Sequence, residues 1–294
     1  MDQAEQLRNI IKASSQNNRP LARVITVTSG KGGVGKSNTC INLALQFKSF
    51  GQRVIILDAD FGLANIEIMF GAIPKNNLSD LIYEGKSIRE IITWGPGDVG
   101  FISGGSGIAG LSNLSREYLI YIIQNLAELD AIADVIIIDT GAGISDAVLE
   151  FLVASGEILV VTTPEPTSIT DSYSLLKALN RHSRFRQEDS RIKVIANRVG
   201  STEEGKSLFH KLNAVVSRYL KLPIQYLGYV PYDGQLSQAV MQQTPVSLYN
   251  PAAKSAVAYK EIAAKLMNKE LNEDLRKRGM AAFFSHIVNG KKMG

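Results

Sequence analysis

Short, strongly apolar runs recur along the chain, and they constrain its fold more than any other feature of the sequence. Several of them are continuous in Val, Ile and Leu, without the alternation expected of a strand that has one face in water. The runs cover residues 24–29, 53–60, 99–104, 134–139, 157–163, 192–198 and 224–230. Strands of this kind are typical of a sheet buried between two layers of helices. The sequence therefore predicts an α/β fold with a doubly wound, mostly parallel sheet of seven or eight strands.

Segments with helical patterning separate these runs and account for the layers on both faces of the sheet. We expect helices at residues 36–50, 115–129, 145–155, 168–182, 205–220, 234–243 and 251–268. No repeat, long linker or low-complexity stretch interrupts the alternation. We therefore predict a single domain over residues 19–268, with an arm at residues 1–18 and a basic segment at residues 269–294.

Composition excludes several classes of protein. The single cysteine, Cys40, leaves no disulfide framework, and no stretch approaches the ~18 apolar residues of a membrane span, so we expect a cytoplasmic protein. Nine Lys or Arg residues and four acidic residues follow residue 250, which leaves the rest of the chain nearly neutral. A neutral body binds duplex DNA weakly, so no specific nucleic acid is expected and an anionic partner would bind the C-terminal segment.

A glycine-rich loop, GKGGVGKS at residues 30–37, joins the first strand to the helix predicted at residues 36–50. This strand-loop-helix setting is the one that a phosphate-binding loop requires. Glycines let backbone amides turn toward the phosphates, Lys36 neutralises their oxygens, and the Ser37 hydroxyl is a ligand for Mg²⁺. The nucleotide contacts predicted from this region are Gly30, Lys31, Gly32, Gly33, Val34, Gly35, Lys36, Ser37 and Asn38.

A second stretch, residues 200–207, also matches the phosphate-loop pattern. Glu203 and Glu204 would place two carboxylates where phosphates should lie, which opposes the binding of an anion. We therefore interpret this second match as an accidental helix start.

Carboxylates follow two of the apolar strands at the edge where parallel sheets bind ligands. Asp58 and Asp60 close the run 53–60, and Asp139 closes the run 134–139. We expect Asp58 and Asp139 to act as metal ligands, Asp139 through the water shell of Mg²⁺, and Asp60 to orient the attacking water. The alternative is that these are turn residues at strand ends.

The residues 197–200 stand where GTPases carry an Asn-Lys-x-Asp segment that reads guanine. Gly200 supplies no carboxylate for the guanine protons, so adenine is favoured, with Asn197 as a candidate partner for its exocyclic amine. The alternative for Asn197 is a loop amide that bonds to backbone.

Lys31 is the additional lysine that marks one family: the chain resembles the deviant Walker A ATPases of the MinD/ParA type. The resemblance extends through residues 58–65, 139–143, 197–198 and 230–233. It implies a P-loop fold of the MinD kind, slow Mg²⁺-dependent ATP hydrolysis, and a homodimer that forms face to face around two ATP molecules. Lys31 would reach the phosphates of the other subunit. The implied roles are catalysis for Lys31, Lys36 and Asp60, and base contact for Asn197, Arg198, Pro231 and Asp233.

Within that family the chain is most similar to the flagellar-number regulators FlhG, FleN and YlxH. The similarity rests on the segment DQAEQLR at residues 2–8 and on residues 58–65. It implies that the arm docks on a signal-recognition-particle-type GTPase, FlhF, and stimulates it through Gln3, and that components of the flagellar basal body are further partners. The implied contacts are Asp2, Gln3, Ala4, Leu7 and Arg8. Without the family, the arm is an ordinary disordered terminus.

The C-terminal segment has one apolar helical face with basic residues on both sides. Such a helix is typical of an in-plane anchor on anionic lipid, and we predict peripheral attachment to the inner face of the cell membrane. The alternative is a last helix packed on the body. The predicted membrane contacts are Met280, Phe283, Phe284, Ile287 and Val288.

Two other functions share the same nucleotide switch. A ParA-type partition ATPase would bind DNA through a basic patch on the dimer, and a MinD-type division-site regulator would bind membrane. The first would need a patch from Arg181, Arg184, Arg186 and Arg191. The arm at residues 1–18 separates the second from the flagellar regulators.

Overall fold

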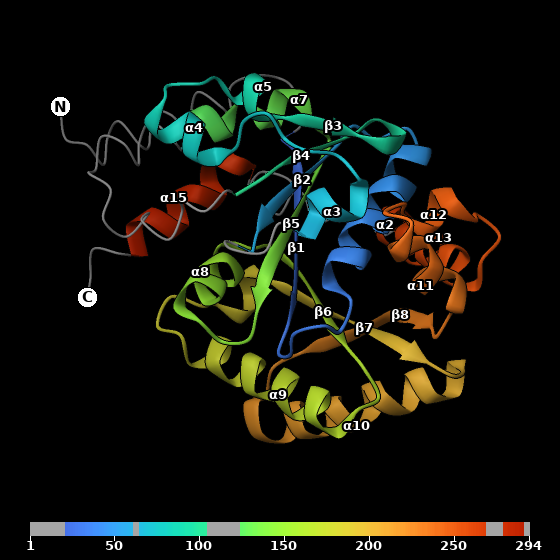
Figure 1. Cartoon of the computed structure of the whole chain (residues 1–294). Helices are drawn as coiled ribbons and strands as arrows, with labels where there is room; N and C mark the ends of the chain where they lie inside the picture. The colour runs from blue at the N-terminus through green and yellow to red at the C-terminus, as the bar shows by residue number, and fades with distance from the viewer. Residues whose placement is uncertain (1–20, 61–64, 105–123, 269–278, 291–294) are drawn as a thin grey trace.

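One sheet runs through the whole body of the protein (Figure 1). The computed structural model describes residues 21–60, 65–104, 124–268 and 279–290. The strand order is β3-β4-β2-β5-β1-β6-β7-β8, and only the β3–β4 pair is antiparallel. The strands are β1 (Arg23–Ser29), β2 (Val54–Ala59), β3 (Thr93–Gly95), β4 (Val99–Ile102), β5 (Val135–Ala142), β6 (Glu157–Thr162), β7 (Arg191–Val199) and β8 (Ile224–Pro231).

All seven predicted strands are confirmed within two or three residues at each end. The eighth, β3, escaped the sequence analysis because its three residues, Thr-Trp-Gly, are too short to show a pattern. It extends the sheet as an edge strand beside β4.

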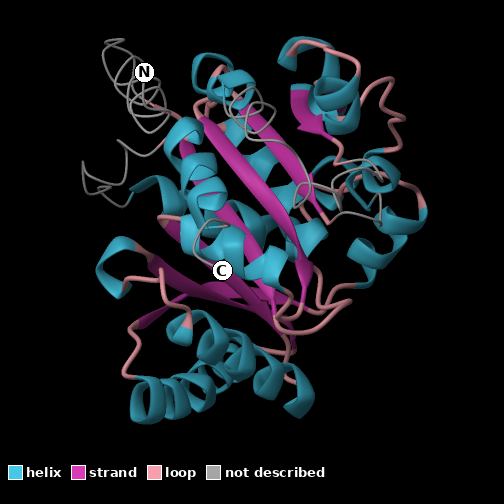
Figure 2. Cartoon of the chain, turned by 90° about the vertical axis from the view of Figure 1, so that its left-hand side faces the viewer, coloured by secondary structure: helices cyan, strands magenta, loops and turns pink. Residues whose placement is uncertain are grey.

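Helices cover both faces of the sheet, as Figure 2 shows from the side. The first layer consists of α2 (Lys36–Ser49), α3 (Asn65–Phe70), α11 (Gly234–Met241), α12 (Val246–Tyr249) and α13 (Lys254–Asn268). The second consists of α4 (Leu78–Tyr83), α5 (Ile88–Ile91), α7 (Leu129–Ile132), α8 (Asp146–Ala154), α9 (Pro166–Arg181), α10 (Thr202–Leu220) and α15 (Met280–Gly290). The doubly wound prediction is therefore confirmed.

Central strands bury both of their faces, which explains their continuous apolar runs. In β5, Ile137 packs with the α2 and α13 layer, whereas Ile136 and Ile138 pack with the opposite layer. The short helices α3, α4 and α5 were not predicted. The helix expected at residues 115–129 lies largely outside the described residues. Within the described ranges, no helix has both the length and the apolar character of a membrane span.

The second phosphate-loop match is a helix start, as predicted. The Ser201 hydroxyl accepts the N–H of Glu204 and caps α10, while the Glu204 carboxylate accepts the N–H of Gly200. The Glu204 carboxylate therefore occupies the backbone N–H that an anion would need, which opposes anion binding at this segment.

The apolar face of α15 packs on the body in this structure, and the predicted membrane contacts stay a prediction. Met280, Phe283, Phe284 and Ile287 are all buried, and Phe151 of α8 lies 6.0 Å and 6.5 Å from the two phenylalanine rings. The structure therefore shows the alternative, a last helix that completes the core. The arm with Asp2, Gln3, Ala4, Leu7 and Arg8 lies outside the described residues, as does the side chain of Val288.

Candidate functional site

The glycine-rich loop leaves the carboxyl end of β1 in the middle of the sheet and leads directly into α2 (Figure 1). Gly33 and Gly35 have φ angles of 74° and 97°, a region that favours glycine, and Gly35 caps α2. A Cβ at Gly30 would come within 2.1 Å of the Asp171 backbone in α9, so no side chain fits there. The loop therefore has the open backbone of a phosphate cradle.

Asp139 lies beside this cradle, and within the part of the chain that the structure describes its carboxylate oxygens lack hydrogen-bond partners of ordinary geometry. The residue is fully buried on β5, and neither carboxylate oxygen has a hydrogen bond of ordinary geometry among the described residues. Burial raises the pKa of Asp139 to about 6, while nearby Ser37 and Lys36 oppose that rise. A buried carboxylate beside a hydroxyl and a lysine, with no partner of its own, fits Mg²⁺ and its water shell.

Asp58 stands beside Asp139 but has a different task. The two residues are paired across β2 and β5, and burial, followed by the charge of Asp139, raises the pKa of Asp58 to about 8. Its oxygens accept the N–H groups of Asp60 at 3.1 Å and Ile66 at 3.5 Å. In this structure Asp58 therefore shapes the turn after β2. The predicted role of Asp58 as a metal ligand stays a prediction.

Asp60 follows the end of β2, and its predicted role in orienting the attacking water stays a prediction. Burial raises the pKa of its carboxyl group, and the charge of Lys36 opposes that rise. A Cβ at Gly141, in the segment after Asp139, would lie 3.4 Å from Asp60 Oδ1. Asp60 therefore stands between the phosphate loop and the end of β5, as the sequence predicted.

Lys31 is directed away from its own cradle. Its ammonium group donates to Glu165 Oε2 at 2.7 Å and to the Thr167 hydroxyl at 2.9 Å, at the start of α9. The Lys31 side chain remains 37% exposed. Sequence reasoning missed Glu165 and Thr167, because they lie more than a hundred residues away in a strand-to-helix turn without a motif.

Asn197 supports the phosphate loop in this structure, and its predicted contact with the base stays a prediction. Its Nδ2 donates to the Val34 carbonyl at 2.7 Å, and its Oδ1 accepts the N–H of Arg198. The side chain is 1% exposed, and a Cβ at Gly35 would clash with its amide. Asn197 therefore bonds to backbone, as in the alternative reading of a loop amide. One of its partners, Val34, is distant in the sequence.

Asp233 ties two helices together in this structure, and its predicted contact with the base stays a prediction. Its Oδ1 accepts the N–H of Gln235 and caps α11, and its Oδ2 accepts the N–H and the hydroxyl of Ser255 in α13. These bonds link the start of α11 to the start of α13, so the carboxylate fixes the two helices against each other.

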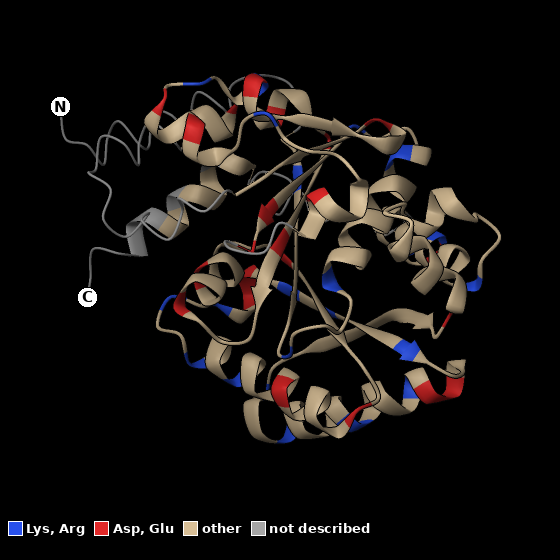
Figure 3. Cartoon of the chain, in the orientation of Figure 1, with Lys and Arg blue, Asp and Glu red and all other residues tan. Residues whose placement is uncertain are grey.

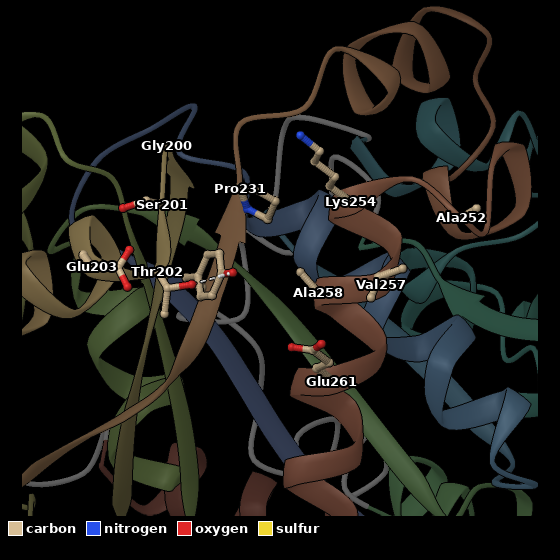
Figure 4. Close-up of a pocket in the computed structure, with 11 residues that line it drawn as sticks. Gly200, Ser201, Thr202, Glu203, Pro231, Ala252, Lys254, Val257, Ala258 and Glu261 are labelled. Atoms are coloured by element: carbon tan, nitrogen blue, oxygen red, sulfur yellow. Dashed lines mark hydrogen bonds between the residues drawn. The ribbon is translucent and has the colours of Figure 1, made fainter.

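Pro231 and the exposed Arg198 do stand on the side where a base is expected. Pro231 lines a hollow of about 470 Å³ at the end of β8, between the start of α10 and α13. Figure 4 shows Pro231 and Thr202 across this hollow from Lys254, Ala258 and Glu261. Arg198 has a φ of 58° and directs the chain from β7 toward Gly200. The sequence prediction for these two residues stays a prediction.

Comparison with known proteins agrees with the site. The CobQ/CobB/MinD/ParA nucleotide binding domain matches residues 25–246, which include the cradle, Asp60, Asp139 and Asn197. The chain belongs to this family. The resemblance inferred from Lys31 and residues 58–65 is therefore confirmed, and the protein is a P-loop ATPase of the MinD/ParA type.

Two relatives of this MinD/ParA-type chain match it over most of its length. "Antiactivator FleN" of Pseudomonas aeruginosa is 41% identical over 244 residues, which are 83% of this chain and 86% of that protein. "Flagellum site-determining protein YlxH" of Helicobacter pylori is 30% identical over 98% of each chain. The solved structure of MinD with Mg-ADP from Pyrococcus horikoshii superposes with a TM-score of 0.64 at 22% identity, covering 84% of this chain and 97% of the other. This last likeness shows the fold.

Proposed function

We propose that this protein is an ATP-driven dimerising switch that regulates the number or placement of flagella. The observation that carries the proposal is the 41% identity to FleN over 83% of the chain, together with the match to YlxH over nearly all of it. A flagellar operon around the gene, or a change in flagellar number on its deletion, tests this assignment. A deletion strain with normal flagella and misplaced division septa would point to a MinD-type regulator instead.

The nucleotide is ATP with Mg²⁺. The cradle at residues 30–37 would hold the phosphates, Lys36 would neutralise them, and Ser37 with Asp139 would hold Mg²⁺ and its water shell. The metal supplies charge neutralisation on the phosphate oxygens. Isothermal titration of ATP with and without Mg²⁺ tests this, and Asp139→Asn should weaken the Mg²⁺-dependent part about tenfold or more.

Dimerisation is supported by the position of Lys31. Its side chain is partly exposed and points away from the cradle of its own subunit, which suits a cation that acts on the phosphates of another. Lys31→Ala should keep ATP binding and lose ATP-dependent dimers, measured by light scattering with a non-hydrolysable analogue. Asp60→Ala should form dimers and lose hydrolysis. Equal hydrolysis rates for Asp60→Ala and the parent would remove Asp60 from the mechanism.

Membrane attachment through α15 requires the helix to leave the body, because its apolar residues are buried here. One contact offers a direct test: a Cβ at Gly279 would lie 2.4 Å from Asp130 Oδ2, so Gly279→Ala should loosen α15. We expect this variant to bind vesicles more tightly than the parent. Gly234→Ala is the matched control, since nothing lies within 4 Å of its added Cβ. Identical, negligible vesicle binding by all three proteins would refute attachment.

Stimulation of an FlhF-type GTPase is proposed for the arm at residues 1–18. A peptide of residues 1–13 should stimulate that GTPase without ATP, because the arm precedes the phosphate loop and needs no nucleotide of its own. Gln3→Ala should abolish stimulation and keep binding, whereas Leu7→Asp should weaken binding. An inert peptide would return the arm to the status of an ordinary terminus.

A further inference from the structure

Arg184 ties α15 to the body from a loop that carries several cations. This residue follows α9, and its guanidinium donates to the backbone carbonyl of His286 in α15 while it pairs with Glu150 of α8. One arginine thus bridges the last helix and the helix on which that helix packs. The Arg184 side chain is 20% exposed, so the bridge is reachable from solvent.

The chain around Arg184 is basic and lies on the same side of the molecule as α15. Five Lys or Arg residues and two acidic residues occur between residues 177 and 191. Arg181 and Arg186 are exposed, and Arg186 also donates to the carbonyls of Ser183 and Phe185. Figure 3 shows this basic colouring at the end of α9 and in the loop that follows it, below α15.

We propose that Arg181, Arg184 and Arg186 form a binding surface for anionic phospholipid headgroups. A lipid phosphate competes with the His286 carbonyl and with Glu150 for Arg184, and α15 is thereby released into the membrane. The inference rests on the membrane attachment proposed above and adds the residues of the body that bind the headgroup and the trigger for release.

The exchange is favourable only at a negatively charged surface. Phosphate offers arginine charge-assisted, bidentate bonds, whereas the His286 carbonyl is a neutral acceptor. Undocking exposes four apolar side chains of α15, and the hydrocarbon of the bilayer replaces the contacts they lose. In a neutral lipid such as phosphatidylcholine the phosphate is balanced by the lipid's own ammonium group, so a neutral bilayer replaces the apolar contacts but has no net negative charge to attract the arginines. The structure therefore favours anionic over neutral membranes, with the selectivity located in the body and not in the helix.

The same cations are less suited to duplex DNA. Three arginines on one loop neutralise few phosphates, and affinity for DNA grows with the number neutralised. An apolar helix beside the cations has no partner on a DNA backbone, but it has one in a bilayer. DNA is therefore an outcome of the test and not the proposal.

The test uses the full chain with ATP and Mg²⁺ and compares sedimentation with vesicles of phosphatidylcholine alone and with added phosphatidylglycerol. The double variant Arg181→Glu/Arg186→Glu should bind the anionic vesicles at least about tenfold less, because each cation near such a surface contributes about fivefold. The double variant Lys75→Glu/Lys260→Glu is the control, since it changes the net charge equally at exposed sites outside the loop. It should stay near the parent. Nucleotide affinity should be the same in all.

Arg184→Gln separates the trigger from simple attraction. It weakens the tie to α15, so binding to neutral vesicles should rise while the ratio of anionic to neutral binding falls about fivefold. An unchanged ratio, or equal loss in the two double variants, overturns the inference while membrane attachment stands. If neither the parent nor Gly279→Ala binds any vesicle, the proposed membrane attachment and the proposed headgroup surface are both refuted. If the loop variants lose retention on duplex DNA but not on vesicles, the surface belongs to nucleic acid.

Discussion

The ammonium group of Lys31 lies 2.7 Å from Oε2 of Glu165, so the signature lysine of the phosphate loop is paired with the first turn of α9. The two residues are 134 positions apart in the chain. Both side chains are partly exposed, and such pairs are weak and easily exchanged. The Lys31–Glu165 pair is therefore weak enough for Lys31 to exchange Glu165 for the phosphates of another subunit.

Glu165→Gln should lower the ATP concentration at which half the protein is dimeric, by at most about fivefold, because the lost pair is a weak competitor. Analytical ultracentrifugation across an ATP series measures the shift. Asp98→Asn removes a comparable exposed pair with Lys48 on another part of the surface and should leave the midpoint unchanged. A weaker dimer in Glu165→Gln would show that Glu165 acts within the dimer.

Asn197→Ala should reduce affinity for ATP, ADP and GTP by the same factor, about tenfold, because it loosens the loop at Val34 and leaves base recognition untouched. Calorimetry with the three nucleotides measures this. Asn180→Ala removes a similar amide-to-carbonyl bond, to Leu220, far along the chain from the loop. Asn180→Ala should lower the free energy of unfolding and leave the affinity for all three nucleotides unchanged. A loss for ATP and ADP that spares GTP would identify Asn197 as an adenine contact.

Glu157→Gln should destabilise the fold by about 3 to 5 kcal/mol, because it leaves the buried Lys193 and the partly buried Arg23 without a counter-charge. Urea unfolding at neutral pH measures the change. Asp134→Asn breaks an exposed pair with Arg53 and, given solvent screening, should cost under about 1 kcal/mol. Similar losses in the two variants would contradict the burial argument.

The same cluster predicts a pH dependence. Burial alone would raise the pKa of Glu157, but the charges of Arg23 and Lys193 outweigh it and hold the pKa below the ordinary 4.5. The folded state therefore releases this proton more readily than the unfolded chain. The stabilisation is complete above about 4.5 and is lost as pH falls through the lowered pKa. In Glu157→Gln this acid-side decline should be shallower, as followed by unfolding at decreasing pH.

Asp130 should have the opposite effect. Its carboxylate accepts the N–H of Met280 at 3.0 Å and 3.1 Å, and burial raises its pKa from 3.8 to about 6 despite those bonds. The folded state holds the proton longer, so this residue's contribution falls as pH rises from about 4 to about 6, by at most ~3 kcal/mol. Asp130→Asn should remove that part of the slope in unfolding measurements. A parallel curve for parent and variant would contradict the prediction.

Local sequence was sufficient for the parts of the site that are contiguous in the chain. The cradle depends on glycines at residues 30–37 between a strand and a helix, and Asp139 depends on an apolar strand that ends in a charge. The cradle and the strand ending in Asp139 each consist of consecutive residues, so local sequence patterns predicted them together with the sheet. The strand β3 and the helices α3, α4 and α5 were missed because three to six residues carry no clear period.

Tertiary structure decided which side chains remain available to a ligand. Asn197, Asp58 and Asp233 look like ligand contacts in the sequence, but each bonds to backbone in the structure. The sheet brings Asn197 to the Val34 carbonyl, Asp58 accepts from the turn after β2, and Asp233 accepts from α11 and α13. The pairing of Lys31 with Glu165 arises in the same way. For α15, periodicity established an apolar face, but the surface that covers that face was set by the neighbouring helices, because burial of apolar area has no direction of its own.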